Sequence, residues 1–340
     1  MISYVVNFAF FLIKPLFRFL EPEWAHKLTL NLVKKGHRVF KFDFSKKYPK
    51  EDFILFGLKF NNRLGMSAGM DKNAEYIDSI GSLGFGFLEL GTVTPKPQSG
   101  NPKPRVFRDY KNNAIINRLG FNNKGVDYAI NKIVKSNYKG VIGLNIGKNS
   151  NTTIERACDD YVYCLNKAHK FVDYITVNIS SPNTSNLRKL QSKNYLNDFT
   201  KEILNNNDEL NKKNKKKLPI FVKISPDETL ISLEQLLITL VNNKVSGVII
   251  SNTSIYRFSE LPSKFSKESG GLSGRPLFEY SNLCLKNASK ILNNEIPIIA
   301  VGGVENKKTF QTKIDLGASL VQLYSGLVFH GPKVISSILK

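Results

Sequence analysis

The sequence is poor in cysteine and histidine, and both shortages restrict the chemistry it can carry. The 340 residues include three cysteines, with no C-x-x-C pair, and four histidines. This excludes a disulfide framework, argues against a structural zinc site and favours a reducing compartment. The histidines do not cluster with Asp or Glu at metal-ligand spacing. We therefore predict no metal site, and surface or structural positions for His26, His37, His169 and His330.

Arginine is scarce for so basic a chain. Lys and Arg total 49 against 28 Asp and Glu, which gives a net charge of +21, yet only 10 of the 49 are Arg. Arginine is the residue best suited to bidentate phosphate and base contacts, so this composition does not favour a nucleic-acid partner. We interpret most of the charge as a Lys-rich surface. The densest run, 212–217, is predicted to be a solvated loop.

No apolar run is long enough to cross a bilayer, which needs about 20 residues. The run at 5–13 ends at Lys14 and Pro15, and it lacks the charge before it and the cleavage site after it that a secretory signal needs. A second helical pattern covers 22–36. Residues 1–40 therefore predict two short amphipathic helices with net positive charge. Such a pair fits a membrane surface or a hairpin packed on its own domain, and the residues alone leave both open.

From residue 64 onward the chain repeats an apolar run, a polar loop and a helical pattern. Predicted strands lie at 64–68, 87–91, 141–147, 174–180, 220–225, 247–252, 298–303 and 320–325. Predicted helices lie at 74–83, 124–136, 153–170, 194–206, 229–243, 278–292, 306–316 and 332–339. Serial β-α units with continuously apolar strands predict an α/β fold, a (β/α)8 TIM barrel over residues 41–340. A doubly wound sheet is less favoured because no dinucleotide or P-loop fingerprint follows the first strand.

Two shorter segments complete the predicted barrel. Residues 53–63 read as a hairpin that closes the barrel floor, and residues 105–118 as a further pair of strands. Every predicted barrel strand ends in amides, hydroxyls, lysine or glycine, and barrel chemistry collects at those ends. Glycines 302 and 303 after the seventh strand, with Ser325 and Gly326 after the eighth, match a barrel phosphate site. With Lys72 and Lys223, they indicate a phosphorylated, electron-accepting cofactor such as FMN.

Taken in order, the motifs resemble the dihydroorotate dehydrogenases of the membrane-associated, quinone-using class. They include SAGMDKN, LELGTVTPKPQSGNPKPRVFR, GLNIGKN, NISSPNT, ISNTS, GGLSGRPL and LVQLYSGLVFHGP, and they span nearly the whole chain. The resemblance implies oxidation of dihydroorotate to orotate in pyrimidine biosynthesis. It implies FMN as the hydride acceptor and a membrane quinone as the final acceptor. In a bacterium it places the protein peripherally on the cytoplasmic side of the inner membrane, against an anionic surface, and we expect a monomer.

The resemblance also assigns roles to residues. Ser181 matches the catalytic base, and Thr184 and Phe121 match positions that hold the accompanying water. The soluble class carries Cys at the base position, so Ser181 favours the quinone class. Implied substrate contacts are Lys72, Asn117, Arg118, Leu119, Gly120, Phe121, Asn178, Asn183, Asn252 and Thr253. Implied FMN contacts are Ala68, Gly69, Met70, Asp71, Lys72, Thr92, Asn145, Asn178, Lys223, Ser251, Gly274, Gly303, Tyr324 and Ser325.

In this class the N-terminal helix pair forms a tunnel that admits the quinone, and His26, Arg108 and Tyr324 match positions that line it. The chain departs from the family pattern in two places. Ser251 replaces a common Thr but keeps its hydroxyl, and Ser185-Asn186 replaces a common Pro-Gly after the base. The second change is expected to alter the stiffness of a lid more than the chemistry.

Three other classes of function compete with this interpretation. An FMN barrel acting on RNA needs a catalytic Cys near a strand end and usually an RNA-binding domain. A soluble fumarate- or NAD-linked dihydroorotate dehydrogenase lacks residues 1–40 and carries Cys at the position of Ser181. A non-catalytic phosphate-binding barrel on a membrane surface gives no purpose to Ser181 and the asparagines around it.

Overall fold

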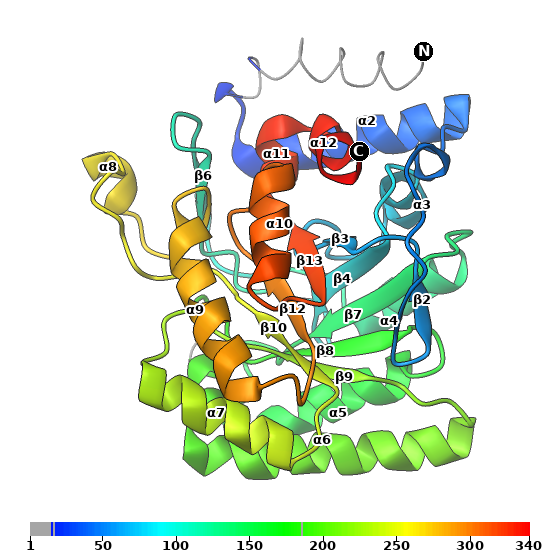
Figure 1. Ribbon diagram of the computed structural model, residues 1–340, viewed down its shortest axis with the longest axis vertical. Coiled ribbons are helices and arrows are strands. Elements are labelled where there is room, and N and C mark those ends of the chain that lie inside the picture. The colour runs from blue at the N-terminus through cyan, green and yellow to red at the C-terminus, as the bar shows by residue number, and fades with distance from the viewer. Residues whose placement is uncertain (1–14, 16–17, 185) are drawn as a thin grey trace.

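A computed structural model describes residues 15, 18–184 and 186–340, and its centre is a closed parallel barrel (Figure 1). The strand order around the barrel is β10-β12-β13-β3-β4-β7-β8-β9. Their bounds are β3 Leu64–Met66, β4 Phe87–Val93, β7 Val141–Ile146, β8 Tyr174–Asn178, β9 Ile220–Lys223, β10 Gly247–Ile250, β12 Ile298–Val301 and β13 Leu320–Leu323. These are the eight strands that the apolar runs predict, so the (β/α)8 prediction is confirmed.

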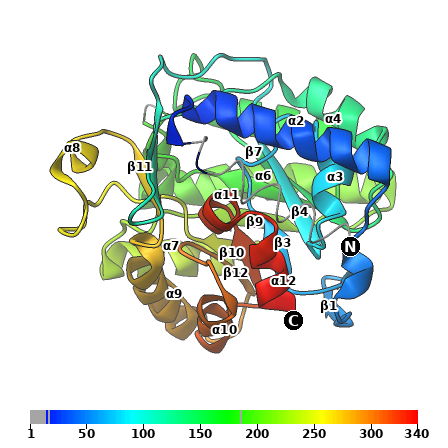
Figure 2. The same cartoon turned by 90° about the horizontal axis from the view of Figure 1, so that it is seen from above.

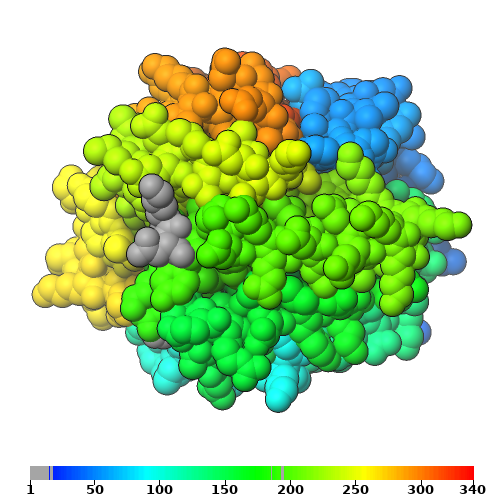
Figure 3. All heavy atoms as spheres, turned by 90° about the horizontal axis from the view of Figure 1, so that it is seen from below, coloured from blue at the N-terminus to red at the C-terminus, as the bar shows by residue number. Residues whose placement is uncertain are grey.

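Helices follow the strands around the barrel. They are α3 Ile77–Gly81, α4 Val126–Val134, α5 Ala157–Ala168, α6 Lys193–Asn214, α7 Leu230–Asn242, α9 Leu277–Leu292, α10 Lys307–Asp315, α11 Ser325–His330 and α12 Lys333–Leu339. Local sequence fixes several starts. Thr229 caps α7 by accepting the N–H of Ser232, and Asn306 and Thr309 form a capping box at α10. Seen from below, α6 and α7 cover the side of the molecule farthest from the N-terminal helix (Figure 3).

Two predictions need correction, the end of the helix at 194–206 and the loop at 212–217. Helix α6 continues through the asparagine run to Asn214, so the lysine-rich run at 212–217 is helical over its first half rather than a loop throughout. Its C-cap Lys215 then adopts a left-handed conformation, and the cap N–H bonds to the carbonyl of Asn211. Asparagine is a weak helix former, but packing against α5 and α7 extends this helix past its local preference.

The barrel floor is closed by aromatic side chains. Strands β1 (Phe53–Leu55) and β2 (Leu58–Phe60) form the predicted antiparallel hairpin. Phe60 meets the ring of Phe87 edge-on at 5.5 Å between centroids, and Tyr174 meets Phe221 at 5.4 Å. These rings join the first residues of the barrel strands in one buried cluster. The polar half of the barrel interior therefore lies toward the carboxyl ends of the strands.

A second, three-stranded antiparallel sheet lies beside the barrel. Strands β5 (Val106–Asp109) and β6 (Ala114–Asn117) confirm the pair predicted within 105–118. Strand β11 (Gly271–Gly274) pairs with β6, which the sequence does not predict. A short helix, α8 (Ser263–Ser266), and the 3-10 helices η2 (Ser45–Lys47) and η3 (Leu187–Gln191) complete the described elements.

The N-terminal helix α2 (Pro22–Phe40) is longer than predicted and lies across the barrel's carboxyl end, beside α3 and β5 (Figures 1 and 2). The Glu21 carboxylate caps it, Pro22 occupies the first turn, and Lys41 ends it in a left-handed conformation. The helix predicted before it lies outside the described residues. Among the residues that the structure describes, no helix is long and apolar enough to cross a membrane.

Candidate active site

A cavity of about 140 Å³ opens at the carboxyl ends of the barrel strands, where most of the sequence-predicted site residues meet. Predicted residues that line it are Ala68, Gly69, Lys72, Thr92, Asn117, Leu119, Gly120, Phe121, Asn178, Ser181, Asn183, Lys223, Ser251, Asn252, Thr253, Gly274, Gly303, Tyr324 and Ser325. They come from the ends of the barrel strands or the loops after them, at every strand except β7, and from β6, β11 and the segment after β6. The barrel therefore assembles residues that lie up to 257 positions apart, from Ala68 to Ser325 (325 − 68 = 257).

Four predicted contacts do not line this cavity. Met70 and Asp71 line the larger cavity described below, and the Asp71 carboxylate accepts the backbone N–H groups of Glu75 and Tyr76. Asn145 is fully buried behind the wall. The guanidinium of Arg118 turns away to Glu268, at 2.8 Å, so the side chain of Arg118 stands outside the site.

Hydrogen-bonded amides form one wall of the cavity. The Asn178 amide donates to the Asn145 side-chain oxygen at 3.1 Å, and the Asn252 amide donates to Asn178 at 3.3 Å. Asn183 donates to the Asn117 side-chain oxygen at 3.3 Å. Because each amide is held by another, their free donors and acceptors have fixed directions. Such a wall suits a flat ligand with a polar edge, and it rejects analogues that leave buried amides without partners.

Ser181 lies on the loop after β8 and is 6% exposed. Its Oγ accepts the backbone N–H of Asn183 at 3.3 Å, which leaves the hydroxyl proton free to point into the cavity. The nearby Thr184 hydroxyl is buried and has no hydrogen-bond partner among the residues that the structure describes. Phe121 adopts a left-handed backbone conformation, with φ 54°. The Thr184 hydroxyl therefore offers an unused hydrogen-bonding group at the position predicted to hold water.

The polar centre of the barrel is Glu89 on β4, a residue that was not among the predicted site residues. This carboxylate is fully buried and lies 4.0 Å from the ammonium of Lys223. It accepts hydrogen bonds from Asn145 at 2.8 Å and Gln322 at 2.6 Å, with further donors from Tyr174 and Thr176. Burial lowers the pKa of Lys223, and Glu89 opposes that shift. The sequence does carry a signal for Glu89, a single charged residue within an apolar strand, in the segment LEL.

Replacing Glu89 with Gln is expected to destabilise the fold by about 3–5 kcal/mol, because the buried Lys223 ammonium loses its counter-charge. Glu51→Gln is the matched control, since Glu51 is 54% exposed and pairs with Arg63 at the surface. That change should cost about 1 kcal/mol or less. Chemical denaturation of both variants measures the difference. Equal, small losses would show that Lys223 does not depend on Glu89.

A glycine turn closes the opposite end of the cavity. Gly303 has φ +71°, and a Cβ placed on it would lie 2.5 Å from the Cβ of Phe278. Gly302 has φ +125°, and its Cβ would lie 2.7 Å from the Ser281 hydroxyl. Only glycine fits this turn, which leaves backbone uncovered at the cavity surface. Next to it, the hydroxyls of Ser273 and Ser325 lie 2.9 Å apart. Uncovered backbone beside paired hydroxyls is the type of surface that barrels use for phosphate.

A larger cavity of about 800 Å³ lies between α2 and the barrel. The three residues predicted to line a tunnel, His26, Arg108 and Tyr324, all line it. Residues that line both cavities are Lys72, Asn117, Leu119 and Tyr324. The two spaces therefore share a wall, which is the arrangement needed for a group in the smaller cavity to exchange electrons with a molecule in the larger one.

Burial sets the protonation of two residues that line the larger cavity. It lowers the pKa of His26 to about 4, assisted by the nearby Lys72, so the imidazole is neutral near pH 7. The His26 Nε2 lies 2.9 Å from the carbonyl of Met70 and donates to it, which leaves Nδ1 as an acceptor. Burial also lowers the pKa of Lys72 to about 8, against the opposing charge of Glu23. Across residues 18–184 and 186–340, no cluster of His, Cys, Asp or Glu could hold a metal ion.

Comparisons with known proteins identify the family of the chain. A family model described as dihydroorotate dehydrogenase matches residues 52–340. A dihydroorotate dehydrogenase (quinone) of Buchnera aphidicola subsp. Schizaphis graminum is 46% identical over 332 residues, which cover 97% of this chain and 99% of the relative. The same named enzyme of Acinetobacter baylyi is 44% identical over 324 residues, 95% of this chain and 96% of the relative.

A crystal structure of DHODH from Eimeria tenella in complex with ferulenol superposes with a TM-score of 0.87 at 36% identity. The match covers 93% of this chain and 89% of that one. A ligand-free structure from the same organism gives a TM-score of 0.86. The chain therefore belongs to the dihydroorotate dehydrogenase family, within the quinone-linked class that its bacterial relatives represent.

Proposed function

We propose that this protein oxidises dihydroorotate to orotate in pyrimidine biosynthesis, with FMN bound in the smaller cavity and a quinone in the larger one. The observation that carries the proposal is the shared wall. A hydroxyl and an amide-lined pocket lie on one side of it, and a cavity open toward α2 lies on the other. FMN can accept a hydride from a substrate in the smaller cavity and pass the electrons, singly or in pairs, to an acceptor in the larger one.

The residues present fit a flavin with a phosphate tail. The Gln322 side-chain oxygen is buried in a residue that lines the cavity, and no group in the described part of the chain donates to it, so it can accept a hydrogen bond from a ligand. Lys223 presents a buried ammonium near Ser67, at 3.5 Å, where negative charge on a reduced ring would be offset. The Gly302-Gly303 turn with Ser325 would hold the phosphate, and Thr92 and Ser251 would contact the ring or its chain.

Ser181 would remove the C5 proton of dihydroorotate while the C6 hydride leaves to the cofactor. A serine is a weak base at its ordinary pKa, so its proton must leave as the new one arrives. The N–H of Asn183 supports negative charge on Ser181 Oγ, and the unpartnered Thr184 hydroxyl can hold a water that carries the proton away. Asn117, Asn183 and Thr253 would hold the ring edge of the substrate.

The Lys72 ammonium would offset the carboxylate of the substrate, and this gives a pH dependence. Well below pH 8 Lys72 is protonated, so the orotate dissociation constant should be constant there. As pH rises above about 8 the charge is lost, and affinity should fall by up to tenfold per pH unit. Titrating orotate against the flavin absorbance from pH 6.5 to 9.5 measures this. The Lys72→Arg variant keeps its charge, so its affinity for orotate should stay constant over this pH range. The same loss of affinity above pH 8 in that variant would show that Lys72 is not the cause.

Peripheral membrane attachment through α2 is supported by its exposed apolar residues. Trp24 is 53% exposed, Leu32 is 46% exposed and Phe40 is 63% exposed, and lysines flank them. Bulky apolar side chains with basic neighbours bind anionic lipid surfaces. Trp24→Glu should therefore reduce co-sedimentation with anionic vesicles. Unchanged co-sedimentation would count against α2 as the contact.

The experiment that tests the function is anaerobic mixing of the flavin-loaded protein with dihydroorotate. The flavin absorbance should bleach, and a quinone added afterwards should restore it. If the flavin absorbance does not bleach, the proposed oxidation of dihydroorotate is wrong. Bleaching without recovery by quinone would retain the first half-reaction and reject the second.

A further inference from the structure

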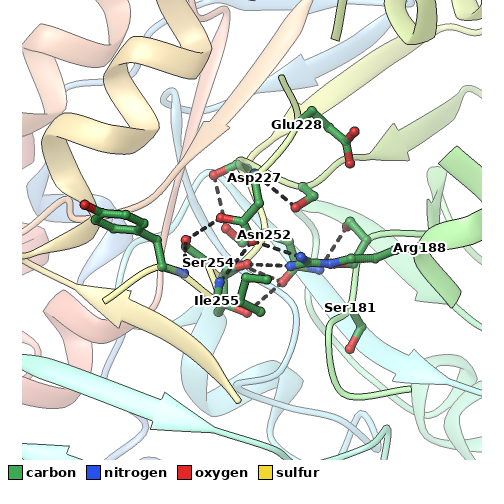
Figure 4. A network of polar contacts seen from close by, with 12 residues as sticks. Ser181, Arg188, Asp227, Glu228, Asn252, Ser254 and Ile255 are labelled. Carbon is green, nitrogen blue, oxygen red and sulfur yellow. Dashed lines mark hydrogen bonds and ion pairs between the residues drawn. The ribbon is translucent and has the colours of Figure 1, made fainter. Parts of the chain in front are cut away.

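Arg188 joins three active-site loops at one point (Figure 4). It lies in η3, just after the loop that carries Ser181, and is 23% exposed. Its Nε donates to the carbonyl of Ser180 at 3.2 Å, and its Nη2 donates to the carbonyl of Thr253 at 3.3 Å. Its Nη1 donates to the Asp227 carboxylate at 2.9 Å. One guanidinium thus connects the loops that follow β8, β9 and β10.

Asp227 fixes the far side of this junction. Its carboxylate accepts the backbone N–H of Ile255 at 3.0 Å and the hydroxyl of Ser254, and it is 11% exposed. Ser254 and Ile255 follow Asn252 and Thr253, which line the smaller cavity. The pair of Arg188 and Asp227 therefore holds the backbone on both sides of the predicted substrate position.

The contact of Arg188 with Ser180 holds the residue that directly precedes the proposed base, Ser181. The carbonyl that Arg188 holds belongs to the peptide bond joining Ser180 to Ser181. In Figure 4 the Ser181 hydroxyl points away from the guanidinium, so Arg188 acts on the loop and not on the hydroxyl. The Asn252 amide also donates to the Ser180 hydroxyl, at 2.9 Å, so the two loops are fixed to each other at a second point.

We propose that Arg188 is a positioning residue that sets the distance between Ser181 and the Asn252-Thr253 loop, an inference that rests on the proposed role of Ser181. A guanidinium presents donors in a rigid fork and can serve three acceptors at once, whereas a lysine ammonium is a single point on a flexible stem. Positioning of this kind carries a large part of catalysis, because a displacement of about 1 Å can cost about a hundredfold in rate. The positive charge of Arg188 pairs with the Asp227 carboxylate, and the shape of its guanidinium lets it donate to the carbonyls of Ser180 and Thr253 as well.

The test is the anaerobic rate of flavin reduction by dihydroorotate in Arg188→Lys and Arg188→Ala. Both should be slower by about ten- to a hundredfold with flavin still bound, because neither side chain can bridge the two carbonyls. Arg156→Lys is the control. Arg156 is 77% exposed and pairs with Asp159 on α5, away from the three loops that Arg188 joins. It should stay within about twofold of the parent, as changes outside the reacting geometry do. A full rate in Arg188→Lys would overturn the bridging role.

A double variant separates positioning from general damage. If Arg188 acts through Ser181, adding Arg188→Lys to Ser181→Ala should slow reduction by less than about twofold, because the group that it positions is already gone. Multiplied losses would show instead that Arg188 supports the fold at large, and would reject the proposal. If Ser181→Ala alone reduces at the parent rate, the proposed function of Ser181 fails first, and that outcome is distinct from either result for Arg188.

Discussion

Ser181→Ala is expected to lower the rate of flavin reduction by dihydroorotate by roughly 10²–10⁴-fold, the usual contribution of a positioned acid or base. The loss follows from the geometry of the loop. The Ser181 hydroxyl lines the smaller cavity, and among the described residues its hydrogen bond is to the Asn183 N–H. An alanine therefore removes the group that takes the proton without disturbing a larger network. Anaerobic stopped-flow absorbance measures the rate.

The same variant carries its own control. Reoxidation of chemically reduced Ser181→Ala by quinone should match the parent, because Ser181 does not line the larger cavity. Ser181→Cys adds a second check, since a thiol with an ordinary pKa near 8.5 ionises more easily than a hydroxyl. Its reduction rate should rise with pH toward about that value. A parent-like rate in Ser181→Ala would remove the hydroxyl from the mechanism.

The sequence predicts the barrel well because its signals are local and repeated. Each strand is a short run that is apolar on both faces, and burial on both faces is what a parallel barrel strand requires. The strand ends could be predicted for the same reason, because parallel strands bring all their carboxyl ends to one rim. The residues of that rim, such as Asn178, Lys223 and Ser325, therefore lie together in the structure as the pattern indicates.

Features that depend on contacts between distant segments could not be predicted in this way. Strand β11 forms only because β6 offers its edge, more than 150 residues earlier in the chain. Arg118 sits in a motif that suggests a substrate contact, yet its side chain pairs with Glu268. Arg188 looks in the sequence like an ordinary loop residue, and Glu89 stands out only as a single charge within an apolar strand. Their importance comes from the partners that folding gives them, Lys223 and Asp227.

Arg108→Met should raise the KM for quinone by roughly ten- to a hundredfold, while leaving flavin reduction by dihydroorotate unchanged. Arg108 lies on β5, lines the larger cavity and donates to the carbonyl of Leu20 at 2.8 Å. Its guanidinium is a charged group with five N–H donors on the wall of this cavity, and such a group suits a quinone carbonyl. A hydrogen bond from a charged donor contributes about 1.5–3 kcal/mol, which corresponds to that change in affinity.

Arg156→Met is the control for Arg108, because Arg156 is 77% exposed and pairs with Asp159 on α5. If Arg108→Met slowed flavin reduction by dihydroorotate as much as it raised the KM for quinone, Arg108 would act in the first half-reaction, which would contradict the prediction.

The two half-reactions follow one another, so the slower one sets turnover. At low quinone concentration the double variant Ser181→Ala/Arg108→Met should therefore turn over at the rate of its slower parent. Losses that multiply would mean that the two cavities do not work in sequence across the wall formed by Lys72 and Tyr324.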